Sequence, residues 1–273
     1  MPRYVAQIAN LLVQGEERTT YSDGSFQRSK TRFVLGGFNF ALFRTRQSFS
    51  MPVRDLKGEF CHTHDLVIDD LDPTELKKVE RLVEEITELL SFATQSQVVK
   101  FGQFFQNASS RQSVRGVALF FRPAFTQGDE IRRFLEQTWR AYHRLRRRRK
   151  LHVVIDYLST AEKGQPLEVQ LLIASAVLES LKSTYAAGAG YKYHRPHWRR
   201  ISKPPKPNIA NEPMVGFENM LREMLRKVRM RPRLRRRNDI VHNGTSRRPA
   251  LSQYASYELA QGLVREYLLR LLG

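Results

Sequence analysis

The ten residues RRRNDIVHNG, from Arg235 to Gly244, combine an arginine cluster with Asn238 and His242. Cleaving a phosphodiester bond without a metal needs a group that moves a proton near neutral pH and a fixed cation that stabilises charge at the phosphorus. Histidine and arginine are the natural pair for these tasks. The segment therefore has two interpretations. It is either a phosphodiester-cleaving site or a charged surface in which His242 lies at a helix C-terminus beside Gly244.

The charge of the chain favours a polyanionic partner. Of 273 residues, 46 are Lys or Arg and 27 are Asp or Glu, which gives a formal net charge of +19 at pH 7. Such an excess repels itself unless a polyanion is close, and nucleic acid is the usual one. A membrane surface is the rival partner, but no stretch approaches the roughly 18 apolar residues of a spanning helix. The first residues also lack a secretory cleavage pattern, so we expect a cytoplasmic protein that does not engage a membrane.

Two short segments resemble fragments of metal sites. CHTH holds Cys61, His62 and His64, and HRPH holds His194 and His197. Neither segment has the second spaced pair of ligands that a closed tetrahedral site requires. We therefore predict no metal and no other cofactor.

The first part of the chain reads as mostly β. Runs such as TRFVLGGFNFALFRT are rich in Phe and Val and are broken by Gly36 and Gly37, as in strands joined by tight turns. A helix then begins at DPTEL, where Asp72 is the expected N-cap and Pro73 the first helical residue. One more strand is expected at VRGVALFFRPAF. Residues 1–124 are thus predicted to form a small strand-rich domain with one long helix.

The second part of the chain reads as helical. Five segments carry apolar residues three and four positions apart, the spacing of an amphipathic helix. They are DEIRRFLEQTWRAYHRL, HVVIDYL, PLEVQLLIASAVLESLKSTY, FENMLREMLRKVR and SQYASYELAQGLVREYLLRLL. Residues 125–273 are therefore predicted to form an all-α bundle, and the whole chain an α+β fold.

A basic loop is expected at residues 188–213, within this bundle. Its prolines argue against a helix, and its cations alternate with Tyr191, Tyr193 and Trp198. Aromatic rings beside cations suit single-stranded RNA, although a disordered linker is the alternative. The cations expected to contact RNA are Arg199, Arg200, Lys203, Lys206, Arg235 and Arg236.

The motif RNDIVHNG resembles the R-x4-6-H signature of the HEPN superfamily, small helical bundles of which many are ribonucleases. Arg237 matches the motif arginine, Asn238 the frequent polar residue after it, and His242 the histidine. The helices expected on either side of the motif agree with a bundle of this kind. The strand-rich region before it is similar to the N-terminal part of abortive-infection HEPN proteins from prokaryotes. The resemblance implies a metal-independent endoribonuclease with Arg237, Asn238 and His242 as catalytic residues.

Helical geometry points separately to a pair of chains. At about 100° per residue, positions five apart on a helix differ by about 140°, so Arg237 and His242 of one chain would not face the same atom. Two copies related by a two-fold axis would bring both pairs into one cleft. This matches the dimeric site that HEPN ribonucleases build. We therefore expect a homodimer through the helices that bear the motif.

Two functional classes stay open. The first is an endoribonuclease that acts as an anti-phage defence or toxin effector in a prokaryote. The second is a non-catalytic HEPN subunit that binds RNA within a larger nucleoprotein complex. A free nuclease would be toxic, so a regulatory partner or an inactive resting state is expected. The N-terminal domain is then the expected place for sensing or docking.

Overall fold

A computed structural model describes residues 2–20, 22–50, 60–106, 108–111, 126–161, 166–194, 197–230 and 250–273. The chain is a mixed α+β protein with an antiparallel sheet, which confirms the predicted class. It forms two compact units, Met1–His143 and Arg144–Gly273. The boundary expected at 124/125 and the strand expected at VRGVALFFRPAF lie outside the described residues.

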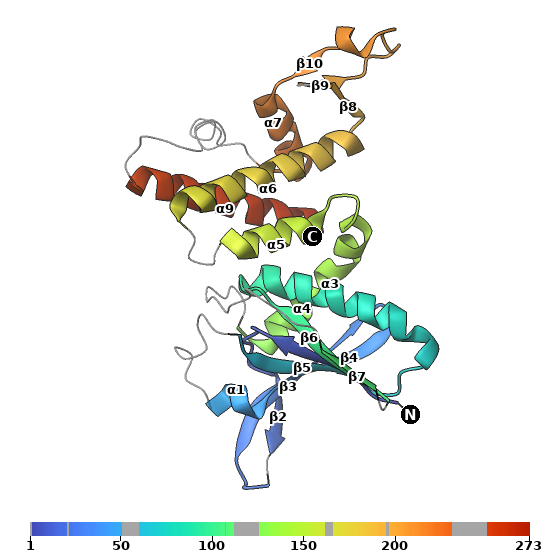
Figure 1. The fold of residues 1–273 in the computed structure, drawn as a ribbon, viewed down its shortest axis with the longest axis vertical. Helices are drawn as coiled ribbons and strands as arrows, with labels where there is room; N and C mark the ends of the chain where they lie inside the picture. Colours follow the sequence, from blue (N-terminus) through green and yellow to red (C-terminus); the bar gives the residue numbers. More distant parts are fainter. Residues whose placement is uncertain are drawn as a thin grey trace. The chain divides into compact units, whose positions relative to one another are not determined.

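The first unit is built on a seven-stranded sheet with the order β2-β3-β4-β5-β1-β6-β7 (Figure 1). Its strands are β1 (Tyr4–Ala9), β2 (Glu17–Thr20), β3 (Phe26–Leu35), β4 (Phe38–Arg44), β5 (His62–Ile68), β6 (Val99–Phe105) and β7 (Ala108–Arg111). A short helix, α1 (Arg46–Ser50), follows β4. Strand β1 pairs antiparallel with both β5 and β6, so the start of the chain is held in the middle of the sheet.

Gly36 and Gly37 form the turn of the β3–β4 hairpin, as the sequence predicts. Both have positive φ, 62° and 88°, which is the conformation of a tight two-residue turn between antiparallel strands. Gly36 also lies against the helix Leu76–Thr94 (α3), because a Cβ there would be 2.9 Å from a methyl carbon of Leu82. The glycine is therefore needed for both its backbone angle and its lack of a side chain.

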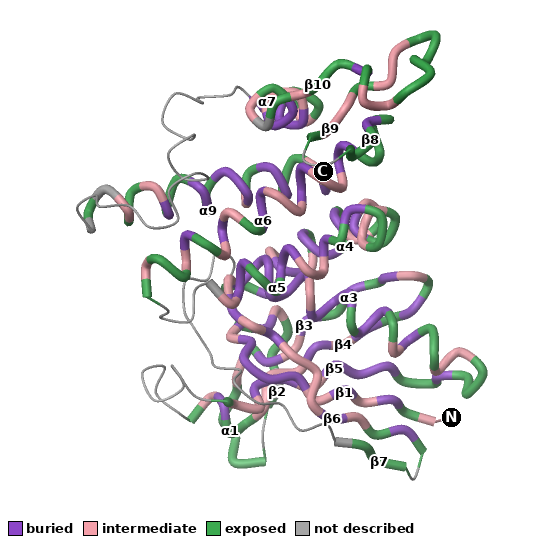
Figure 2. The backbone as a smooth tube through the Cα atoms, turned by 45° about the horizontal axis from the view of Figure 1, so that its top comes forward, coloured by how far each residue is buried: buried purple, intermediate pink, exposed green. Residues whose placement is uncertain are grey.

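Helix α3 (Leu76–Thr94) lies along one face of the sheet (Figure 2). A 3-10 turn, η1 (Pro73–Glu75), precedes it, and Asp72 accepts a hydrogen bond from the amide of Thr74 at 2.8 Å. The predicted cap is therefore confirmed at this helical start. The apolar spacing of this helix predicts one buried stripe, and its first member, Leu76, is half-buried. The other members are fully buried: Val79, Val83, Ile86 and Leu90.

Helix α4 (Gly128–Leu145) packs beside α3 within the first unit. Phe134 contacts Phe92 with ring centroids 6.2 Å apart. The buried carboxylate of Glu85 accepts hydrogen bonds from Trp139 Nε1 at 2.9 Å and from His143 Nδ1 at 3.0 Å. A buried carboxylate is costly unless it is bonded in this way, so these donors determine how α4 lies on α3.

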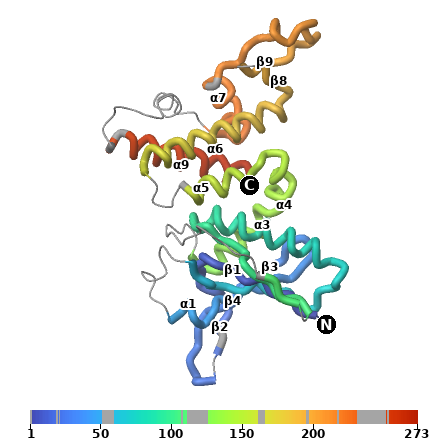
Figure 3. The backbone as a smooth tube through the Cα atoms, viewed as in Figure 1, coloured from blue at the N-terminus to red at the C-terminus, as the bar shows by residue number. Residues whose placement is uncertain are grey.

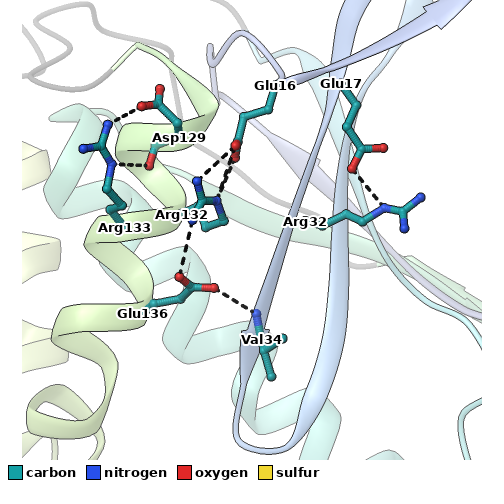
Figure 4. A network of polar contacts seen from close by, with 8 residues as sticks. All are labelled: Glu16, Glu17, Arg32, Val34, Asp129, Arg132, Arg133 and Glu136. Atoms are coloured by element: carbon teal, nitrogen blue, oxygen red, sulfur yellow. Dashed lines mark hydrogen bonds and ion pairs between the residues drawn. The ribbon is translucent and has the colours of Figure 1, made fainter.

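Polar contacts tie the start of α4 to the strands (Figure 4). Arg132 donates hydrogen bonds to the Glu16 carboxylate from Nε at 3.0 Å and from Nη2 at 3.2 Å. Its Nη1 lies 3.8 Å from Oε2 of Glu136. Glu136 in turn accepts a hydrogen bond from the backbone amide of Val34 at 3.3 Å. Two further ion pairs in the same view are Arg133–Asp129 and Arg32–Glu17. The network orients α4 relative to β3 through side-chain and backbone bonds.

His64 on β5 is fully buried rather than available to a metal. One ring nitrogen, Nε2, lies 3.2 Å from the carbonyl oxygen of Val13, and Nδ1 is buried without a hydrogen-bond partner among the described residues. Burial lowers the pKa of His64 from 6.5 to about 3, and the charge of Arg44 adds to this effect. The imidazole therefore stays neutral in the folded protein at neutral pH.

This histidine makes stability depend on pH. Between pH 6.5 and about 3 the unfolded chain binds a proton at His64 that the folded chain does not, so stability falls as the pH is lowered. From pH 7 to pH 5 this site is expected to remove about 2 kcal/mol of unfolding free energy. Urea unfolding at both pH values measures the loss. His64→Gln keeps a donor for Val13 but cannot titrate, so an equal loss in that variant would contradict the prediction.

The second unit is a set of helices packed around α6 (Figure 3). The helices are α5 (Leu151–Ala161), α6 (Leu167–Gly188), α7 (Phe217–Lys227) and α9 (Ala250–Leu272), and each was predicted from its apolar spacing. Leu171 and Ala174 of α6 pack against Tyr257 and Ala260 of α9. None of the described helices offers a stretch long and apolar enough to cross a membrane.

Arg149, two residues before α5, forms hydrogen bonds with the C-terminal parts of both α6 and α9. It is only 8% exposed, and its Nη2 donates to the Leu181 carbonyl at 3.2 Å and to the Tyr267 hydroxyl at 2.7 Å. Its Nε donates to Thr184 Oγ1 at 3.2 Å. The first half of α6 thus packs on the first half of α9, and Arg149 connects the last parts of both helices. The two helices therefore run in the same direction.

Candidate nucleic-acid interface

The predicted catalytic residues and two of the predicted RNA-binding arginines all fall between α7 and α9 in the sequence. Arg235, Arg236, Arg237, Asn238 and His242 belong to residues 231–249, which lie outside the described residues. The described ends of that segment are well separated, because Arg270 in the last turn of α9 donates to the Arg229 carbonyl at 3.0 Å. Residue 229 therefore lies at one end of α9 and residue 250 at the other, about 30 Å apart along the helix.

The predicted loop at residues 188–213 contains strands. Strands β8 (Tyr191–His194), β9 (His197–Arg200) and β10 (Met214–Val215) form a sheet in the order β10-β9-β8, and a 3-10 turn, η2 (Ile209–Asn211), precedes β10. We call residues 191–200 the basic hairpin. The expectation of a loop is corrected here, because the prolines at 204, 205 and 207 follow β9 instead of interrupting it. The alternating aromatic and basic residues match the period of a strand.

The aromatic residues of the basic hairpin are not equivalent. Tyr193 and Trp198 are cross-strand partners with ring centroids 5.3 Å apart, and Tyr193 is 54% exposed. Tyr191 lies two cross-strand pairs away from them and is only 5% exposed. Tyr193 and Trp198 can therefore meet a base, whereas the ring of Tyr191 is covered. Most of the hairpin is exposed or half-exposed (Figure 2).

Glu223 on α7 explains why Tyr191 is buried. Its carboxylate accepts hydrogen bonds from Tyr191 at 2.5 Å, from Tyr185 of α6 at 2.9 Å and from Arg200 at 2.6 Å. Burial raises the pKa of Glu223, but the two phenol hydrogen bonds and the charge of Arg200 outweigh it, so its pKa is lowered. The ionised carboxylate anchors the hairpin to α6 and α7, and Arg200 is engaged in that anchor.

A second carboxylate closes the turn that follows the hairpin. Glu212 is 2% exposed and accepts hydrogen bonds from Ser202 Oγ at 2.6 Å and from the amide of Lys206 at 2.8 Å. These bonds, that from Ser202 first, lower the pKa of Glu212. Arg199 donates to the Glu212 carbonyl at 2.6 Å, and Lys206 Nζ is also bonded within the turn. Lys203 and Lys206 both have exposed side chains, although Lys206 is bonded within the turn.

The sequence analysis missed these two carboxylates. Glu212 and Glu223 lie among many acidic residues with no motif around them, and their importance comes from partners 6 to 38 positions away. Among the described residues no group of three or more His, Cys, Asp or Glu side chains could hold a metal. His194 and His197 are exposed cross-strand partners at the tip of the hairpin.

Removing the anchor should loosen the hairpin and little else. Glu223→Ala leaves Tyr185, Tyr191 and Arg200 without their shared acceptor, so amides of residues 191–200 are expected to exchange with solvent roughly 10-fold faster or more. Hydrogen exchange followed by mass spectrometry measures this. Glu218→Ala on the same helix removes a carboxylate that is 42% exposed and pairs with Arg222, and it serves as the control. Equal protection in both variants would contradict the anchoring role.

Comparisons of the chain with protein-family models, with curated proteins and with solved structures gave no match. The functional argument therefore depends on the residues of this chain and their chemistry.

Proposed function

We propose that the protein is a metal-independent endoribonuclease of the HEPN type that acts in the cytoplasm as a defence or toxin effector. The observation that carries the proposal is the position of the motif Arg237–His242 in a helical unit. The motif lies between α7 and α9, and both of these helices pack on α6. The exposed cations and aromatic rings of the same unit suit an RNA substrate.

In this proposal the three motif residues divide the chemistry. His242 moves the proton of the attacking 2′-hydroxyl or of the leaving 5′-oxygen, because imidazole titrates near neutral pH. Arg237 stabilises the charge on the pentavalent phosphorus, and Asn238 positions the phosphate or the imidazole. No step in this scheme needs a metal.

The decisive experiment is cleavage of end-labelled RNA by the purified protein in EDTA. Cleavage that persists in the chelator and disappears in His242→Ala supports the ribonuclease. Products with 3′-hydroxyl ends would overturn the mechanism, because attack by the 2′-hydroxyl leaves a 2′,3′-cyclic phosphate or its 3′-phosphate hydrolysis product.

The active form is proposed to be a homodimer. Large apolar side chains are exposed on the first halves of α6 and α9, namely Leu172 at 63%, Leu251 at 84% and Tyr254 at 46%. Leu251 and Tyr254 follow the motif closely in the sequence. Exposed apolar side chains of this kind support a dimer contact on these helices. Full cleavage activity in a sample that sediments only as monomer would contradict this.

A non-catalytic RNA-binding subunit is the second candidate. The observation that favours it is the basic hairpin with its exposed cations and rings. Glu223 anchors this hairpin and Glu212 fixes the turn after it, and both carboxylates lie outside the motif segment. RNA binding by the wild-type chain with no cleavage in any buffer, with or without a metal, would select this function. A larger nucleoprotein complex would then supply the activity.

A further inference from the structure

A second basic segment lies in the helical unit, away from the hairpin in sequence. Residues 146–150, RRRRK, form the turn that leads into α5, and Lys150 has a φ of 51°. Arg147, Arg148 and Lys150 are exposed, whereas Arg149 points inward. We call the three exposed residues the basic turn.

The inward arginine determines where the basic turn sits. Arg149 is bonded to Leu181 and Thr184 in the last part of α6, so the turn is held at the C-terminal end of that helix. Arg148 lies directly over the end of α6, because a Cβ at Gly188 would be 3.0 Å from its Nη2. A cation at this end is stabilised by the helix dipole, since the last carbonyls carry partial negative charge.

The same helix end leads into the basic hairpin. Only two residues separate Gly188 from Tyr191, the first residue of β8, so their Cα atoms are at most about 11 Å apart. Two basic segments that lie some 40 positions apart in the chain are thus neighbours in the structure. Within the described part of the chain no carboxylate forms an ion pair with Arg147, Arg148 or Lys150. The described residues around them therefore do not neutralise their charge.

We propose that the basic turn and the hairpin bind one single-stranded RNA together. Arg147, Arg148 and Lys150 contact phosphates, as do the exposed cations of the hairpin region, Lys192 and Lys203. Bases of the same strand stack on Tyr193 and Trp198. This inference rests on the proposed function for its choice of RNA, but it concerns binding and not cleavage.

The arrangement favours an unpaired strand over a duplex or a lipid surface. Aromatic rings can stack only on bases that are not already stacked on one another, so a duplex would leave Tyr193 and Trp198 without a role. A lipid surface would use the cations but would gain little from two rings that contact each other on an anchored hairpin. A single strand of RNA uses both the cations and the rings, because its phosphates can contact the cations while its bases stack on Tyr193 and Trp198.

Salt dependence tests the basic turn. The full chain carrying His242→Ala is titrated with labelled oligouridine of roughly 20 nucleotides, a length that covers more than one site of the usual size. Replacing Arg147, Arg148 and Lys150 with Ser removes three phosphate contacts, so the slope of log K against log salt should become shallower by about 2. The control variant removes three exposed cations of the other unit: Arg28, Lys77 and Arg81. It should keep the original slope.

Stacking is tested separately. Tyr193→Ala with Trp198→Ala should weaken binding roughly 5- to 150-fold per stacked base, with an unchanged salt slope. An equal change of the salt slope in the control variant would overturn the inference, because the loss of any three exposed cations would then weaken RNA binding in the same way. Tight binding to phosphatidylserine vesicles, lost in the turn variant and indifferent to the aromatic pair, would overturn it in favour of a lipid.

The outcome for binding is distinguishable from the outcome for cleavage. If wild-type protein cleaves no RNA but the turn and aromatic variants bind as expected, the ribonuclease proposal fails and the binding surface is supported. If RNA is cleaved but neither variant changes binding, the surface proposed here is wrong and the ribonuclease stands.

Discussion

His242→Ala is expected to lower the rate of RNA cleavage about 10²- to 10⁴-fold, the usual contribution of a general acid or base. The reason is that alanine cannot take the proton from the 2′-hydroxyl or return one to the leaving oxygen. RNA binding should change little, because His242 is not among the cations and rings proposed to hold the strand. The fold should also be kept, which circular dichroism checks.

The assay distinguishes this mechanism from metal-dependent hydrolysis. Activity of the parent protein should survive EDTA, and its products should carry 2′,3′-cyclic phosphate or 3′-phosphate ends. DNA of the same sequence should resist cleavage, because it lacks the nucleophile. Should His242→Ala cleave as fast as the parent, the catalytic role of the motif is wrong.

Arg237→Lys is the matched companion to this variant. Lysine keeps the positive charge but loses the planar guanidinium that donates two parallel hydrogen bonds to a phosphate. Most of the cleavage should therefore be lost while the salt dependence of RNA binding stays the same. If RNA binding were lost together with cleavage, Arg237 would contribute to binding of the RNA substrate and not specifically to stabilisation of the transition state.

The second large effect is on stability. Arg149→Ala should lower the free energy of unfolding by about 3 kcal/mol, since it leaves a cavity and removes the donor to the Leu181 carbonyl, Thr184 and the Tyr267 hydroxyl. These bonds connect the turn before α5 with α6 and α9, so their loss affects three helices together.

Chemical denaturation of both variants in parallel makes the comparison. Arg148→Ala, one position away, removes an exposed guanidinium at the end of α6 and should cost no more than about 0.5 kcal/mol. Similar losses from the two variants would show that burial of Arg149 contributes little. Arg149→Lys should fall between them, because an ammonium cannot reach all three acceptors at once.

Local features of this protein could be predicted from the sequence because the signals and the structures they specify lie within a few residues. Asp72 caps the helical start that contains Pro73, and the cap needs only the amide two positions on. Gly36 and Gly37 form the tight turn that their positive φ requires. The apolar stripes predicted the helices of both units, since helical spacing alone decides which residues share a face.

Only the tertiary structure decided which basic and aromatic residues are available to a partner. Tyr191 and Tyr193 look alike in sequence, yet one is covered because Glu223, 32 positions away, accepts its hydroxyl. Arg148 and Arg149 are adjacent, yet Arg149 is buried through contacts with Leu181 and with Tyr267, 118 positions away. Such contacts leave no local pattern, because the partners become neighbours only when the helices pack. The motif from Arg237 to His242 stays a prediction from sequence, since its residues lie outside the described part of the chain.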